Sequence, residues 1–176
     1  ICHRQLHGVW QCCSFVQLRG DGSRDINYTY QWKRDRLLMR VLQVVNDMHR
    51  AGLETMLMNY YRNINREDIQ FDFLTHRAYK SDYDDEIISL GGKMYYAPRL
   101  YPQNYLQYFK WMRTFFYDHP EYQIIHSHID TMSYLPLLAA KKARIPVRIA
   151  HSHNTSIDKD FKYPLKQFFR TQITSV

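Results

Sequence analysis

The residues of this chain whose type and spacing are best suited to chemistry are four histidines. They form two copies of the tripeptide His-Ser-His, at residues 126–128 and 151–153, and each copy ends a short apolar, β-branched run. Alternate side chains of a strand share one face, so both imidazoles of each copy should project from the same side. Imidazoles in such pairs can hold a divalent metal, exchange a proton or hydrogen-bond a polar substrate.

The segment between the two tripeptides has a helical pattern over residues 132–143, and this arrangement predicts a βαβ unit. Parallel strands joined by a right-handed crossover bring their carboxyl ends to the same edge of a sheet. We therefore expect the four imidazoles to meet in one crevice, which is where open α/β sheets bind ligands.

The chain from residue 39 onward alternates between strand and helix patterns. Strands are predicted at 40–45, 71–75 and 93–97, and helices at 53–61, 83–90, 104–117 and after Pro164. The chain is long enough to bury one good core and hardly two. The pattern therefore predicts a single α/β domain with a mostly parallel sheet.

Composition limits the partners of the protein. The 176 residues carry a net charge of +7, but the basic residues are dispersed, so we expect a solvated positive face and no nucleic-acid partner. All three cysteines lie within the first 13 residues, so no disulfide framework is expected and a reducing cytosol fits. No run of 18 apolar residues is present, which predicts a soluble or peripheral cytoplasmic protein.

Residues 1–38 have no periodicity of 2 or 3.6, and the orderly pattern starts at Met39. Our hypothesis is that Met39 is the natural start and that residues 1–38 are an unassigned extension, either upstream readthrough or a borrowed segment. A disordered or strand-adding extension is the alternative. The spacing of five potential zinc ligands in this extension matches no familiar site: Cys2, His3, His7, Cys12 and Cys13.

Several segments of residues 39–176 resemble the N-terminal half of the family 4 glycosyltransferases, and most closely the bacterial enzymes that build capsular and exopolysaccharides. The two most specific segments are Leu90-Gly91-Gly92 and Ala150-His151-Ser152-His153-Asn154-Thr155-Ser156. The resemblance also rests on segments 41–45, 48–55, 71–74, 84–87 and 126–128. Residues 1–38 match nothing in the family.

The resemblance implies a GT-B architecture, in which two Rossmann-like domains, each a three-layer sandwich, face one another across a cleft. This chain would supply the N-terminal, acceptor-binding domain and lack the C-terminal donor domain, so we expect it to be inactive alone. The implied reaction moves a sugar from a nucleotide-diphosphate sugar to a saccharide or lipid-linked acceptor in cell-surface polysaccharide synthesis. It retains the anomeric configuration and needs no cofactor or metal.

The expected site residues follow from the chemistry of the side chains and from the family resemblance. Gly52 should open a helix whose free N–H groups face a diphosphate. The resemblance implies that His153 contacts the transferred sugar as the catalytic residue. The short polar side chains that follow His153 are suited to bind sugar hydroxyls. Two further candidates come from the first tripeptide, which ends at His128 and is followed closely by Asp130. The expected substrate-binding residues are Gly52, His128, Asp130, Asn154, Thr155 and Ser156.

The remaining polar residues at the crevice have structural interpretations. His126 and His151 are expected to be structural. Asp130 and Asp47 could bind the acceptor or act as a weak base, but we favour a role for each as the N-cap of the next helix.

Two other functions stay open at this point. His-x-His at strand ends is a ligand spacing of divalent-metal hydrolases, although supporting carboxylates are missing. The chain could also be a non-catalytic subunit of a split transferase. The aromatic residues of 104–117 should pack mainly on the sheet, and the resemblance adds peripheral contact with an anionic inner-membrane surface near Lys110 and Arg113.

Overall fold

The computed structural model describes residues 15–18, 38–154 and 163–176, with side chains from residue 38 onward. It contains a six-stranded sheet in the order β1-β6-β5-β2-β3-β4. Every neighbouring pair from β6 through β4 is parallel, and only the pair β1 and β6 is antiparallel. The predicted α/β class, with its mostly parallel sheet, is confirmed. The strands are β1 (Phe15–Leu18), β2 (Met39–Val44), β3 (Ile69–Thr75), β4 (Met94–Tyr96), β5 (Ile124–Ser127) and β6 (Val147–His151).

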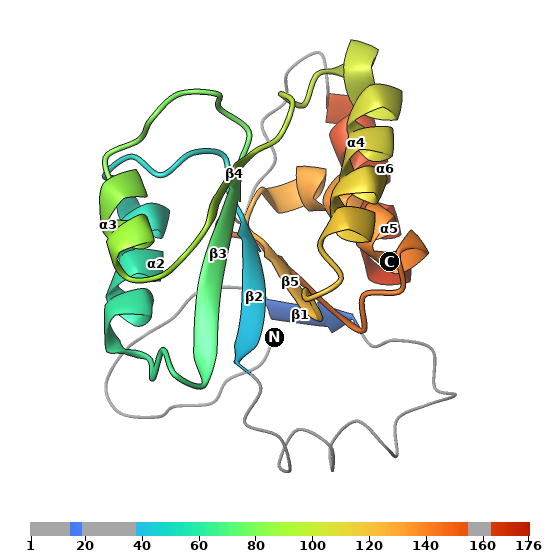
Figure 1. Ribbon diagram of the computed structural model, residues 1–176. Coiled ribbons are helices and arrows are strands. Elements are labelled where there is room, and N and C mark those ends of the chain that lie inside the picture. The colour runs from blue at the N-terminus through green and yellow to red at the C-terminus, as the bar shows by residue number, and fades with distance from the viewer. Residues whose placement is uncertain (1–14, 19–37, 155–162) are drawn as a thin grey trace.

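Helices cover both faces of the sheet and complete a three-layer, Rossmann-like arrangement (Figure 1). On one face lie α2 (Gly52–Asn63) and α3 (Asp84–Ser89), and on the other lie α4 (Tyr105–Asp118), α5 (Tyr134–Lys142) and α6 (Tyr163–Gln172). Short 3₁₀ turns are η1 (Pro102–Asn104), η2 (Asp130–Ser133) and η3 (Ile173–Ser175). No helix within the described ranges is long and apolar enough to cross a bilayer.

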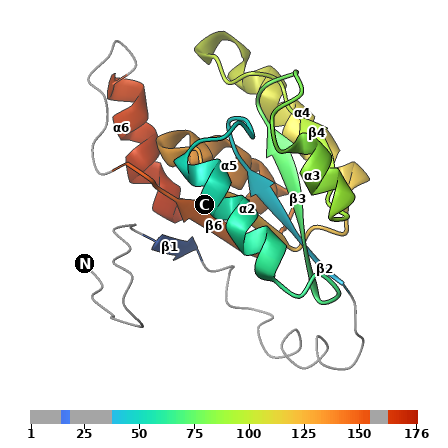
Figure 2. The same cartoon turned by 90° about the vertical axis from the view of Figure 1, so that its left-hand side faces the viewer.

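The chain reverses its direction of travel across the sheet between β2 and β5. It runs outward from β2 through β3 to β4, returns to pair β5 with the other side of β2, and continues to β6. Figure 2, a view turned by a quarter turn from Figure 1, shows β1 and β6 toward one end of the sheet and β3 and β4 toward the other. Such a reversal leaves a crevice beyond the carboxyl ends of the two central strands.

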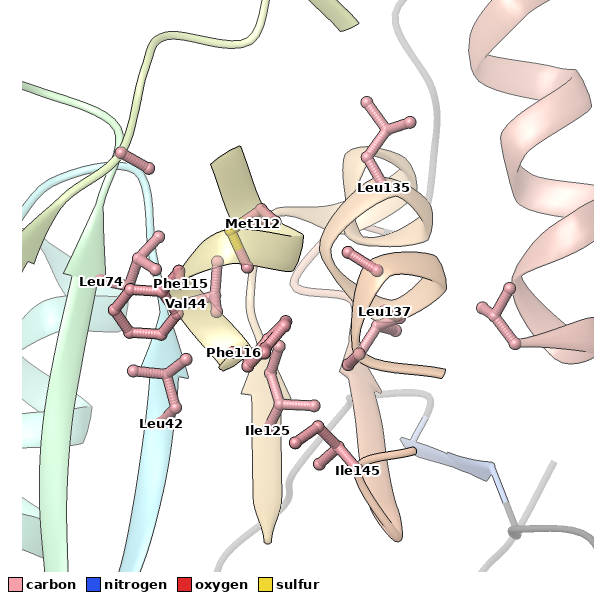
Figure 3. Packing of buried hydrophobic residues seen from close by; sticks show 14 of the residues in the cluster. Leu42, Val44, Leu74, Met112, Phe115, Phe116, Ile125, Leu135, Leu137 and Ile145 are labelled. Atoms are coloured by element: carbon pink, nitrogen blue, oxygen red, sulfur yellow. The ribbon is translucent and has the colours of Figure 1, made fainter. Parts of the chain in front are cut away.

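The larger core fills the space between the sheet and helices α4, α5 and α6. Figure 3 shows side chains of β2 and β5, such as Leu42 and Ile125, facing Phe116 of α4 and Leu137 of α5. On α4 the side chains of Tyr108, Met112, Phe115 and Phe116 are buried, so the predicted packing of the aromatic helix on the sheet is confirmed.

A smaller core under α2 and α3 explains the Leu-Gly-Gly motif. Gly91 has a positive φ of 92°, which glycine adopts at little cost. A Cβ added at Gly92 would lie 2.7 Å from the Phe71 carbonyl oxygen and 2.8 Å from the Tyr61 hydroxyl, too close for any other residue. These glycines therefore let the chain after α3 pass close to β3, which is a structural role.

The segment to which the sequence assigned no element contains β1, which pairs antiparallel with β6 from Phe15 opposite His151 to Leu18 opposite Arg148. This pairing corresponds to the strand-adding alternative. Each of the candidate zinc ligands in this segment, from Cys2 to Cys13, lies outside the described residues.

Candidate functional site

The carboxyl edge of the parallel sheet is hollowed by a cavity of about 350 Å³. Its walls come from the segments that follow β2, β3, β4 and β5, as expected for a crevice at the reversal point of the sheet. A volume of this size lies at the lower end of the range for small-ligand sites. The lining residues are Asn46, Leu53, His76, Arg77, Arg99, Leu100, Tyr101, His128, Ile129, Asp130 and Met132.

The four histidines of the two tripeptides form one stack of rings beside this cavity. Ring centroids lie 3.9 Å apart for His126 and His128, and 4.2 Å apart for His151 and His153. The two pairs meet because β5 and β6 are adjacent and parallel, and the rings of His126 and His151 lie 5.4 Å apart with nearly parallel planes. The predicted convergence of the imidazoles is therefore confirmed.

Hydrogen bonds from Gln43 through His128 to His153 define which ring nitrogen carries each proton. Nε2 of His128 lies 2.9 Å from Oε1 of Gln43 on β2, so this nitrogen donates to the amide oxygen. Nδ1 of a neutral His128 then has a lone pair, and Nε2 of His153, 3.1 Å away, donates to it. The Nδ1 atom of a neutral His153 consequently keeps a lone pair, and it has no hydrogen-bond partner among the described residues.

Burial keeps these rings uncharged at neutral pH. Burial lowers the pKa of His126 to about 3. It also lowers the pKa of His128, which is only 3% exposed. The pKa values of His151 and His153 are lowered mainly by the same burial, which the negative charge of Asp130 partly offsets. The stack therefore acts through neutral imidazoles, which can hydrogen-bond a substrate without attracting it as cations would.

Asp130 fastens the end of β6 to the end of β5. Its carboxylate accepts hydrogen bonds from the Ser152 hydroxyl at 3.1 Å, the His153 amide at 2.9 Å and the Asn154 side-chain amide at 2.6 Å. The predicted N-cap role is wrong for Asp130, because Ile129 occupies the N-cap of η2 and Asp130 lies inside that turn. It is also wrong for Asp47, because α2 has Ala51 as its N-cap. Asp130 thus positions His153 through the backbone.

Gly52 opens α2, as the sequence predicted. The N-cap Ala51 has no side-chain hydrogen bond to the first turn. A Cβ added at Gly52 would have no atom within 4 Å, so the protein itself does not require glycine here. Free N–H groups beside open space are what an anionic group at a helix N-terminus needs.

Two comparisons with known proteins agree on the family. The family model described as Glycosyltransferase Family 4 matches residues 50–175. The chain belongs to this family. It is also 41% identical over 124 residues to "Putative glycosyltransferase EpsF" of Bacillus subtilis (strain 168). That match covers 70% of this chain and 32% of the relative, so the chain spans about a third of that relative's length. No solved structure matches it.

Within the family 4 domain, the predicted site residues occupy one edge of the sheet. His128 and Asp130 line the cavity, and His153 and Asn154 adjoin it through Asp130. His128 is more deeply buried than His126, although the sequence analysis favoured His128 as the substrate contact. Thr155 and Ser156 lie outside the described residues.

Sequence reasoning missed other residues of the site. Gln43 lies inside a strand and becomes recognisable only through its contact with His128. His76 and Arg77 follow β3 directly, so the rule that singled out the ends of β5 and β6 would have found them as well. Arg99 lies in the loop after β4, where no sequence pattern distinguishes it.

The metal alternative can be tested against the donor set. Nitrogen atoms of His126, His128 and His151 all lie within 4.8 Å of one another, close enough for a common metal ion. However, both ring nitrogens of His128 are engaged, with Gln43 and with His153, so a metal would have to displace one of these hydrogen bonds. No carboxylate joins this group within the described ranges. The residues thus fit a hydrogen-bonded stack better than a hydrolytic metal centre.

Proposed function

We propose that this chain is the acceptor-side domain of a retaining glycosyltransferase. In the complete enzyme it moves a sugar from a nucleotide-diphosphate sugar to a saccharide or lipid-linked acceptor in cell-surface polysaccharide synthesis. Membership of Glycosyltransferase Family 4 supports the transferase chemistry. The likeness to the Bacillus subtilis protein supports a bacterial, exopolysaccharide-type enzyme. The donor-binding part lies outside this chain.

The observation that carries the proposal is the position of His153 relative to the N-terminus of α2. His153 follows β6, and Gly52 opens the helix after β2, so both lie at the carboxyl edge of the parallel strands. A diphosphate at Gly52 would be stabilised by backbone N–H groups, and a sugar beside it would meet the Nδ1 lone pair of His153. A nucleotide-diphosphate sugar needs these two contacts at once.

The reaction that fits this edge requires no protein nucleophile. The bond between the anomeric carbon and the donor phosphate oxygen breaks, and the acceptor hydroxyl oxygen bonds to that carbon on the same face. The acceptor proton passes to the departing phosphate. The protein then contributes orientation and charge stabilisation, through His153 on the sugar and the N-terminus of α2 on the phosphate.

The test uses the full-length enzyme that contains this chain. It is incubated with a panel of nucleotide-diphosphate sugars and acceptors, and the anomeric configuration of the product is read by NMR. We expect transfer with the donor's anomeric configuration retained. An inverted product would contradict the retaining mechanism, and an enzyme that transfers from no nucleotide sugar would contradict the proposed function.

We also propose that the enzyme works in the cytoplasm at the inner face of the membrane. On α4, Leu106 is 82% exposed and Tyr117 is 85% exposed, and the cations Lys110 and Arg113 are also exposed. Exposed apolar side chains with basic neighbours can bind an anionic interface. The full-length enzyme should co-sediment with phosphatidylglycerol vesicles at low salt and release from them at high salt. Equal sedimentation with neutral phosphatidylcholine vesicles, or none with either, would contradict this.

A further inference from the structure

Two arginines line the cavity at the edge of the sheet, and neither has a carboxylate partner among the described residues. Arg77 follows β3 and Arg99 lies in the loop after β4, so each reaches the cavity from a different segment. None of the ion pairs in the described part of the chain involves either guanidinium. The Nε atom of Arg77 is buried and has no hydrogen-bond partner there. Arg99 donates through Nη1 to the Tyr101 hydroxyl at 3.3 Å.

The other titratable groups facing the cavity do not neutralise these cations. The imidazoles of His76 and His128 are uncharged, because burial lowers the pKa of both. Asp130 is the one carboxylate among the described residues of the cavity wall, and its oxygens already accept three hydrogen bonds from residues 152–154. The cavity therefore presents two guanidinium groups and a surplus of positive charge. An unpaired buried Nε is costly unless a ligand satisfies it.

We propose that Arg77 and Arg99 bind a phosphate or diphosphate group of the acceptor. This inference rests on the proposed transferase function. Guanidinium groups match phosphate oxygens through paired N–H donors, and this is the recognition for which arginine is better suited than lysine. The ligand is thus a glycosyl phosphate, either a soluble sugar phosphate or a saccharide joined to a lipid through phosphate.

The strand order places this phosphate at the far end of the acceptor from the reacting hydroxyl. Arg77 follows β3 and His153 follows β6, and the order β6-β5-β2-β3 separates them by three strand spacings, about 14 Å in total. An acceptor held by Arg77 and Arg99 must extend across the ends of β2 and β5 to reach His153. A saccharide with a phosphate at its non-reacting end has the required shape. The donor diphosphate, by contrast, is expected at Gly52.

The first experiment measures binding to this chain by titration calorimetry, with inorganic pyrophosphate as the probe. We expect Arg77→Gln and Arg99→Gln each to weaken binding by about tenfold or more, the scale of one lost charge-assisted pair. Arg113→Gln is the matched control, because it removes an exposed arginine of α4 outside the cavity. Equal weakening by Arg113→Gln, or no weakening by the cavity variants, would overturn the proposal. Arg77→Lys, which keeps the charge, covers the case in which Arg77→Gln unfolds.

The second experiment separates the acceptor from the donor in the full-length enzyme. Arg77→Gln and Arg99→Gln should raise KM for a phosphate-bearing acceptor at least tenfold, leave KM for the donor unchanged, and have no effect with the same saccharide lacking phosphate. A raised donor KM would assign the arginines to the donor diphosphate and overturn the proposal. A soluble sugar phosphate and a prenyl-diphosphate-linked saccharide in detergent are the two acceptor arms. The arm with the lower KM identifies the source.

Failure of this inference can be distinguished from failure of the proposed function. If the enzyme transfers sugar and the arginine variants behave as wild type, the inference is wrong and the transferase function stands. If the enzyme transfers nothing from any nucleotide sugar while the chain binds pyrophosphate through both arginines, the function is wrong and a phosphate site remains. That second outcome would also overturn the acceptor assignment.

Discussion

At the scale of single residues, the chemistry of His153 is set by side chains distant in the sequence. Gln43 on β2 holds His128, and His128 holds His153, so that each ring nitrogen has a defined role. Because burial keeps the rings neutral, this relay transmits orientation and tautomer rather than charge. A mutation in any of the three should therefore affect what His153 offers to a substrate.

His153→Ala in the full-length enzyme should lower kcat by about a hundredfold, the scale seen when one preorganised hydrogen-bonding group is removed from a transition state. His151→Ala should instead act chiefly on stability, because His151 is only 8% exposed and lies within the stack. Initial rates and melting temperatures of both variants separate these roles. Wild-type rates in His153→Ala, with lost activity at unchanged stability in His151→Ala, would reverse the assignment.

At the scale of elements, two polar side chains hold strand ends in register at the crevice. Asp130 ties the end of β6 to η2. Nδ1 of His76 donates to the Val45 carbonyl oxygen at 2.9 Å, and Nε2 of the neutral ring accepts from the Tyr108 hydroxyl at 2.9 Å, so His76 joins the ends of β2 and β3 to α4. The crevice is held open by these contacts and by the separation of the strands at the reversal point.

Asp130→Ala should destabilise the protein by roughly 1–3 kcal/mol, because it leaves the groups that bond the carboxylate without their acceptor. Asp130 also has a positive φ of 48°, so Asp130→Gly is the matched variant that removes the carboxylate while relieving the backbone. Urea unfolding should find Asp130→Gly the more stable of the two. Both should have reduced kcat, and full activity in both would show that Asp130 does not position His153.

His76 should make the protein less stable in mild acid. Burial lowers its pKa to about 4, whereas an unfolded chain has a histidine pKa of about 6.5. Between these values the unfolded state binds the extra proton, so the stability present above pH 6.5 is lost as the pH falls toward 4, at about 1.4 kcal/mol per pH unit. Urea unfolding at pH 7, 6 and 5 measures the slope.

His76→Asn is the control for that titration, because the other buried histidines also favour the neutral form. The slope for His76→Asn should be shallower than that of the wild type. Parallel slopes for the two proteins would show that His76 does not contribute.

At the scale of the whole molecule, the chain is an α/β domain of Glycosyltransferase Family 4, and we propose that it forms the acceptor side of the complete enzyme. It has two hydrophobic clusters, one on each face of the sheet. Among the described residues, their first member along the chain is Leu42. The match covers 32% of the curated relative. We therefore expect this chain to fold by itself without catalysing sugar transfer.

The 176-residue chain alone should neither hydrolyse a nucleotide-diphosphate sugar nor transfer from it, because in the proposed function His153 and Gly52 provide only one side of the donor site. Nucleotide release is followed against a buffer blank, with the full-length enzyme as the positive control. Turnover by the purified chain above that blank would contradict the division of roles between the two domains.

Deleting residues 1–38 should leave the melting temperature nearly unchanged. The deletion removes β1, a four-residue strand at the sheet edge, while the parallel strands from β2 to β6 remain. Differential scanning calorimetry of the two chains measures the effect. A large fall in melting temperature would show that pairing of β1 with β6 is an integral part of the sheet.

The amino-acid sequence by itself determined the alternation of strands and helices, the parallel pairing of the two tripeptide strands and the common face of their histidines. These features follow from periodicity and from the handedness of crossovers, which are local properties of the backbone. Only the tertiary structure decided that His128 would be buried against Gln43, that Asp130 would bind residues 152–154, and that Arg77 and Arg99 would share a cavity. Such contacts join residues far apart in the chain. They depend on strand register and loop paths, which no local pattern encodes.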